Sequence, residues 1–94
     1  MLLNKTLIKK TVTRQITQKR KIIDKLDATI IKLLNHRLRI AQYIVNLKRK
    51  YGLPITSSQR EKQIINKLQK ISKNKDLKKE IPKIYKIIFR LSKK

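Results

Sequence analysis

The chain has 94 residues, of which 27 are Lys or Arg and 5 are Asp or Glu, and its formal net charge is +22. It contains no Cys and one His, which excludes disulfides, thiolate catalysis and Cys-based metal sites, and a single His cannot build a metal site unaided, so we expect no metal. No apolar run approaches the roughly 18 residues of a membrane span, and the opening MLLNKTLIKK is interrupted by Lys too early for a secretory signal, so we expect a cytoplasmic protein without a membrane partner.

The first segment, residues 1–14, carries four cations and no acid, and its Thr residues lower the helix propensity. We interpret it as a frayed basic arm, or as a partly ordered extension of the helix that follows. Residues 15–94 are assigned to one helical domain.

A long helix is expected from about Gln15 to Lys50, because apolar residues recur there at three-to-four spacing. The stripe consists of Ile23, Leu26, Ile30, Leu33, Leu34, Ile40, Ile44 and Leu47. Arg37 interrupts it, and Lys48, eleven residues later, returns to nearly the same face at ~100° per residue. A cation on an apolar face is costly unless an anion meets it. Since the chain has only 5 acids, a ligand is a candidate for that anion.

Two shorter helices follow. Gly52 and Pro54 are typical of a helix end, and Ser58 with Glu61 matches a capping box that would begin a second helix. The apolar face of this helix would contain Ile64, Ile65, Leu68 and Ile71, and SKNKD would form a polar turn after it. The third helix is expected to be short, because Pro82 fits only near a first turn.

The predicted fold is all-α, with one long and two short helices. A helix of this length, over about 40 Å, cannot bury its stripe against the rest of so small a chain. Pairing with a second copy is the expected remedy, so the sequence predicts an intertwined helical homodimer.

From Ile22 to Leu68 the chain closely resembles the all-helical (AroQ-type) chorismate mutases. The matching pieces, in order, are Ile23-Asp24 with Leu26-Asp27, Leu33-Leu34 with Arg37, Lys48, Gly52-Leu53-Pro54-Ile55, and Arg60-Glu61. The resemblance extends over about residues 20–92, and the ordered set is far more specific than any single piece.

The resemblance implies a domain-swapped dimer that converts chorismate to prephenate, in the shikimate-pathway branch toward Phe and Tyr. This rearrangement needs no metal and no cofactor. It implies catalytic roles for Arg37, Lys48 and Glu61, which would hold a carboxylate, the ether oxygen and the substrate hydroxyl. It implies substrate binding by Arg20, Arg60, Ser57 and Ser92, with Arg20 contributed by the partner subunit. Arg20 and Arg37 lie about 25 Å apart along one helix, so one small ligand could not contact both within a protomer.

The chain departs from the family pattern in two places. Ser57 stands where many members have Asp. The family's last catalytic position, a Gln or Glu, falls four residues after the Ser matched by Ser92, which lies beyond Lys94. Losing one such donor typically costs ~10²–10³ in rate, so we expect weakened activity.

The net charge leaves an alternative open. The charge has two possible origins. It can follow from a composition rich in Lys, Ile and Asn, or it can serve to attract an anionic partner such as RNA or a small anionic molecule. The alternative function is therefore a catalytically degenerate chorismate-mutase-like fold that acts as a basic RNA-binding or ribosome-associated protein.

Overall fold

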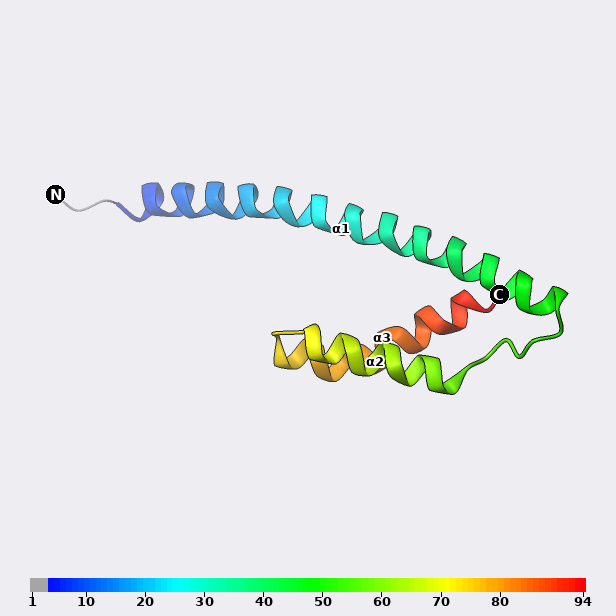
Figure 1. Cartoon of the computed structure of the whole chain (residues 1–94). Coiled ribbons are helices and arrows are strands. Elements are labelled where there is room, and N and C mark those ends of the chain that lie inside the picture. The colour runs from blue at the N-terminus through cyan, green and yellow to red at the C-terminus, as the bar shows by residue number, and fades with distance from the viewer. Residues whose placement is uncertain (1–3) are drawn as a thin grey trace. The chain divides into compact units, whose positions relative to one another are not determined.

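The computed structural model describes residues 4–94, and within that range it contains three α-helices and no strand. Helix α1 spans Lys5–Lys50, α2 spans Ser58–Ile71 and α3 spans Lys75–Ser92 (Figure 1). The predicted all-α architecture of one long and two shorter helices is confirmed. None of these helices is long and apolar enough to cross a membrane.

Helix α1 begins at Lys5, about ten residues earlier than the start predicted near Gln15. The side-chain Oδ1 of Asn4 caps it by accepting a hydrogen bond from the Leu7 amide at 2.8 Å. The hydroxyl of Thr11 donates to the Leu7 carbonyl at 3.0 Å, which accommodates a threonine inside the helix. Residues 5–14 therefore agree with the second interpretation of this segment, an extension of the helix that follows. The start near Gln15 was placed too late because propensity alone counts neither the cap nor these local bonds. Residues 1–3 of the predicted arm lie outside the described range.

The chain divides into two units, the first ending at Asn35 and the second running from His36 to Lys94. In the first unit the predicted apolar stripe is present but uncovered. Ile23, Leu26 and Ile30 are 52%, 57% and 52% exposed. Burial of these side chains would stabilise the fold, since removing apolar surface from water contributes about 25 cal/mol per Å².

The second unit contains the core. Helices α2 and α3 pack against each other and run antiparallel (Figure 1). The most buried apolar side chains are Val45 of α1 and Ile81, Ile88 and Phe89 of α3. The predicted apolar face of α2 is half-buried, except that Ile71 at its end is exposed.

The inward face of α1 in this unit differs from the predicted stripe by one residue. It consists of Arg37, Leu38, Ala41, Val45 and Lys48, all buried or half-buried, whereas the predicted Ile40, Ile44 and Leu47 remain 49%, 46% and 39% exposed. Periodicity places Arg37 and Lys48 on one side correctly. It cannot tell which of two adjacent apolar faces packs within the chain, since both repeat at helical spacing.

The end of α1 follows the predicted glycine stop. Gly52, the one glycine in the sequence, has a φ of 67°, which lies in the left-handed region. The Leu53 amide bonds to the Lys48 carbonyl at 2.8 Å and the Gly52 amide to the Arg49 carbonyl at 3.4 Å. This pair of bonds is a Schellman motif, which satisfies carbonyls that the helix leaves without partners and reverses the chain.

The third helix is longer than predicted. It begins at Lys75, capped by the Asn74 side chain, and Pro82 lies inside it rather than in its first turn. A proline has no amide hydrogen, so the Lys78 carbonyl four residues earlier loses its helical donor. The Gln69 side chain of α2 donates to that carbonyl at 3.1 Å. A contact from the neighbouring helix therefore compensates the proline, which no local rule anticipates.

We predict that Gly52→Ala lowers the free energy of unfolding by about 1–2 kcal/mol, because an L residue is strained at positive φ. A Cβ at this position meets no atom within 4 Å, so the effect isolates backbone strain. Thermal unfolding followed by circular dichroism measures it, with Lys50→Ala on the exposed last turn of α1 as the control. Equal melting temperatures for the two variants would contradict the assigned conformation.

Candidate functional site

The second unit contains a pocket of about 310 Å³ between the end of α1, the connecting loop, the start of α2 and the end of α3. Its volume lies at the lower end of the range for small-molecule sites. The polar side chains that line it are Arg37, Lys48, Ser57, Arg60, Glu61, Ser92 and Lys93. Six of the seven site residues proposed from the sequence therefore meet here. The seventh, Arg20, belongs to the first unit and is not among the lining residues.

The Arg37 guanidinium is held from α3. Its Nη1 donates to the Ser92 Oγ at 3.1 Å, and its Cζ lies 5.6 Å and 5.8 Å from the ring centroids of Tyr85 and Phe89. The two rings contact each other edge to face, with centroids 5.7 Å apart. Cation–π contacts of this kind fix a guanidinium without neutralising it. Arg37 thus keeps its charge and its remaining N–H donors for a ligand.

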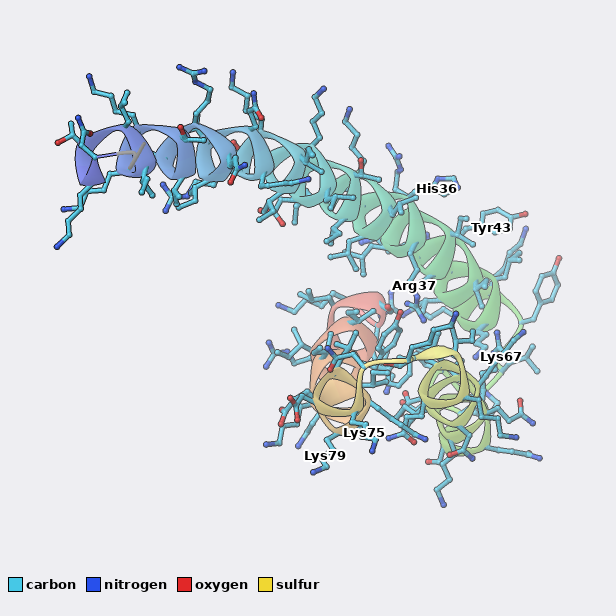
Figure 2. The ribbon with its side chains drawn as sticks, turned by 90° about the vertical axis from the view of Figure 1, so that its left-hand side faces the viewer. His36, Arg37, Tyr43, Lys67, Lys75 and Lys79 are labelled. Carbon is cyan, nitrogen blue, oxygen red and sulfur yellow. The ribbon has the colours of Figure 1, made fainter. Side chains whose placement is uncertain are left out.

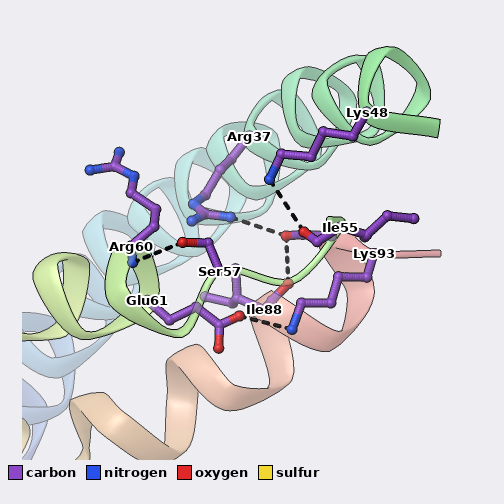
Figure 3. A network of polar contacts seen from close by, with 9 residues as sticks. Arg37, Lys48, Ile55, Ser57, Arg60, Glu61, Ile88 and Lys93 are labelled. Atoms are coloured by element: carbon purple, nitrogen blue, oxygen red, sulfur yellow. Dashed lines mark hydrogen bonds and ion pairs between the residues drawn. The ribbon is translucent and has the colours of Figure 1, made fainter. Parts of the chain in front are cut away.

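Ser92 is the one buried polar side chain among residues 4–94. Its hydroxyl donates to the Ile88 carbonyl at 2.6 Å and accepts from Arg37, so both of its principal bonding directions are used. The Ser92 hydroxyl thus lies between the Arg37 guanidinium and the Ile88 carbonyl, and dashed lines from the labelled Arg37 and Ile88 mark these two bonds in Figure 3.

Lys48 extends across the pocket from α1 to the loop. Its Nζ donates to the Ile55 carbonyl at 3.3 Å, which leaves two further N–H donors on the ammonium group. The turn at Gly52 returns the loop to the same side as the Lys48 ammonium, so the glycine stop and this contact belong to one local arrangement.

The N-cap of α2 is Ser57 rather than Ser58, which corrects the predicted capping box by one residue. Ser57 has extended backbone angles, φ −124° and ψ 99°, and its Oγ accepts from the Arg60 amide at 3.2 Å. Two adjacent serines make the register ambiguous in the sequence. The shift matters because it removes Glu61 from the cap and leaves its carboxylate for the pocket.

Glu61 instead pairs with a residue that the sequence did not indicate. Its Oε2 lies 2.8 Å from the Lys93 Nζ, and the two side chains are 28% and 32% exposed (Figure 3). Lys93 is one of many lysines in the chain, and nothing in its local sequence distinguishes it from Lys94 beside it.

Four cations and one carboxylate therefore line the pocket. In the part of the chain that is described, Arg37 and Lys48 form no ion pair with a carboxylate. This excess of positive charge favours a small ligand with more than one anionic group, and the fixed donors could orient it. His36, the neighbour of Arg37, is exposed and points away from the pocket, while Arg37 points toward α3 (Figure 2).

Comparison with known proteins gives consistent results. The model of the family described as chorismate mutase type II matches residues 19–94. A chorismate mutase of Methanocaldococcus jannaschii is 32% identical over 75 residues, covering 79% of this chain and 76% of that protein. A bifunctional chorismate mutase/prephenate dehydratase of Aquifex aeolicus is 37% identical over 59 residues, covering 63% of this chain but only 16% of that protein. No solved structure gives a significant match. Neither relative's name refers to nucleic acid, so the RNA-binding alternative has no support here.

We predict that Ser92→Ala lowers the free energy of unfolding by about 1–2 kcal/mol, because it removes a buried hydrogen bond to a charged group. Ser58→Ala, an exposed position at the start of α2, is the matched control and should change stability by less than about 0.5 kcal/mol. Urea unfolding measures both. If Ser92→Ala is no more destabilising than Ser58→Ala, Arg37 does not depend on this hydroxyl.

Proposed function

Because the chain belongs to the chorismate mutase type II family, we propose that it catalyses the rearrangement of chorismate to prephenate in the synthesis of Phe and Tyr. The observation that supports this best is the convergence of Arg37, Lys48, Arg60 and Glu61 on one pocket with excess positive charge. Chorismate carries two carboxylates and one hydroxyl, which such a pocket can recognise.

The proposed reaction is an intramolecular Claisen rearrangement, in which one C–O bond breaks and one C–C bond forms within the same molecule. It requires no nucleophile and no cofactor, because no group is transferred to or from the protein. The protein contributes by holding the substrate in a compact, chair-like shape and by stabilising the charge that develops on the ether oxygen.

Arg37 is proposed to bind one substrate carboxylate. Its guanidinium is held in place by Ser92 and two aromatic rings, so little side-chain entropy is lost on binding. Lys48 is proposed to donate to the ether oxygen and to a carboxylate, because its ammonium has donors left after the bond to Ile55.

Glu61 is proposed to accept the hydrogen of the substrate hydroxyl, and Arg60 to add positive charge at the pocket. Ser57 can contribute a donor, because its oxygen caps α2 as an acceptor and its hydroxyl hydrogen remains to be shared. Ser92 is proposed to take part in carboxylate binding together with Arg37. Its own hydroxyl hydrogen is engaged by the Ile88 carbonyl, so we assign its contribution to orienting Arg37.

The active assembly is proposed to be a homodimer in which the partner subunit supplies Arg20. Two observations support it. The pocket within one chain contains no part of the first unit, and the apolar stripe of that unit is uncovered. Pairing the stripes of two copies would bury both, and it would add a fifth cation to each pocket.

We predict that the purified protein consumes chorismate faster than the spontaneous reaction, and that Lys48→Ala lowers kcat by at least about 10²-fold, the typical cost of one oxyanion donor. The melting temperature of Lys48→Ala should change little, since this side chain is half-buried. Loss of chorismate absorbance measures the rate, with Arg37→Ala as the inactive reference. A parallel loss of stability and activity would argue against a catalytic role for Lys48, and no turnover by the wild type would overturn the proposed function.

We further predict that two inactive variants restore activity when mixed. Arg20→Ala and Arg37→Ala chains, refolded together in equal amounts, form half mixed dimers, each with one intact and one doubly altered pocket. Activity should return to about a quarter of the wild-type value for a shared site. Each variant refolded alone is the control. Failure of the mixture to exceed the controls, with dimers present by light scattering, would exclude a partner-supplied Arg20.

A further inference from the structure

The ion pair between Glu61 and Lys93 forms part of the pocket wall. Glu61, Phe89 and Lys93 line the pocket on one side and a second, wider hollow between α2 and α3 on the other. The pair therefore lies at the boundary of the site rather than out in solvent. An ion pair that is about 30% exposed is less screened than one on an open surface.

Three helices fix the position of Lys93. It is the C-cap of α3, and its amide bonds to the Arg90 and Leu91 carbonyls. Its own carbonyl accepts from the Arg49 Nη2 of α1 at 3.4 Å. Its ammonium reaches the Glu61 carboxylate of α2. A lysine whose backbone is held on two sides is a better anchor than one on a frayed terminus.

Glu61 needs such an anchor because it has competing partners. It is the one carboxylate among the pocket's lining residues, and Arg37, Lys48 and Arg60 line the same pocket. Without the Lys93 ammonium, the carboxylate would be attracted toward these three cations and free to pair with one of them. That pairing would neutralise a charge intended for the ligand, and it would move the acceptor oxygen out of place.

We propose that Lys93 is a positioning residue for Glu61, an inference that rests on the proposed function. Lys93 binds Oε2, which leaves Oε1 as the acceptor for the substrate hydroxyl. By keeping Glu61 at the wall, it leaves Arg37, Lys48 and Arg60 for the two carboxylates and the ether oxygen. Lys93 acts through Glu61 and does not itself contact the substrate.

The test compares Lys93→Met, Lys93→Arg and the matched control Lys94→Met in steady-state turnover of chorismate. We expect Lys93→Met to lower kcat/KM about tenfold, the effect of losing one charge-assisted hydrogen bond, with both a higher KM and a lower kcat. Lys93→Arg retains the cation and should stay within about threefold of the wild type. Lys94→Met should leave both constants unchanged.

A double variant separates positioning from direct contact. If Lys93 acts only through Glu61, then Glu61→Gln/Lys93→Met is as slow as Glu61→Gln alone, within about twofold. A further tenfold loss in the double variant would overturn the proposal, because Lys93 would then have a role of its own. Melting temperatures for all variants, with assays run well below them, exclude loss of folded protein as the cause.

The two hypotheses fail in different ways. An active wild type whose Lys93→Met and Lys94→Met variants are equally fast would overturn the role of Lys93 and leave the proposed function intact. A wild type that does not turn over chorismate would overturn the proposed function, and this inference with it.

Discussion

The constraint on which this protein depends is the gathering of like charges in a small space. Four cations line a pocket of about 310 Å³ with one carboxylate among them. Such a group repels itself, and water screens it less in a hollow than on an open surface. Arg37 is therefore stabilised by two aromatic faces and a hydroxyl rather than by an acid. The positive charge of Arg37 is therefore not neutralised by a carboxylate of the chain. A pocket that is to recognise a small molecule with two negative groups needs such a charge.

Several parts of this arrangement could be predicted from the sequence because their causes are local. The helical repeat of apolar residues predicted three helices, and Gly52 predicted the end of α1. The eleven-residue spacing predicted that Arg37 and Lys48 lie on the same face of α1, and both line the pocket. The resemblance to a family, more than any local rule, brought Arg60, Glu61 and Ser92 into the same site. Their grouping depends on how α2 and α3 fold back on α1, which periodicity does not encode.

Of the predictions that failed, the start of α1 and the cap of α2 were local choices that propensity does not settle, whereas the length of α3 depended on a contact from another helix. The serine pair could cap α2 in two registers, and only the folded chain selects Ser57 and releases Glu61. The proline rule placed Pro82 in a first turn, yet a side chain from another helix supplies the missing donor. Lys93 could not be distinguished among so many lysines, since its importance comes from the residue it meets. In a chain with so many lysines, the sequence alone does not show which lysine contacts a residue of the site.

The antiparallel pair of α2 and α3 is linked near both ends, by Gln69 to the Lys78 carbonyl beside the turn and by Glu61 to Lys93 at the pocket. Pro82 makes the first link possible, because it leaves the Lys78 carbonyl without a helical donor. The bond from Gln69 then fixes the position of α2 along α3. A slip of one helical residue moves a side chain about 1.5 Å along the axis. That displacement would exceed the tolerance of a 2.8 Å contact at the opposite end. The hydrogen bond that Pro82 leaves out of α3 thus helps to align Glu61 with Lys93, several helical turns away.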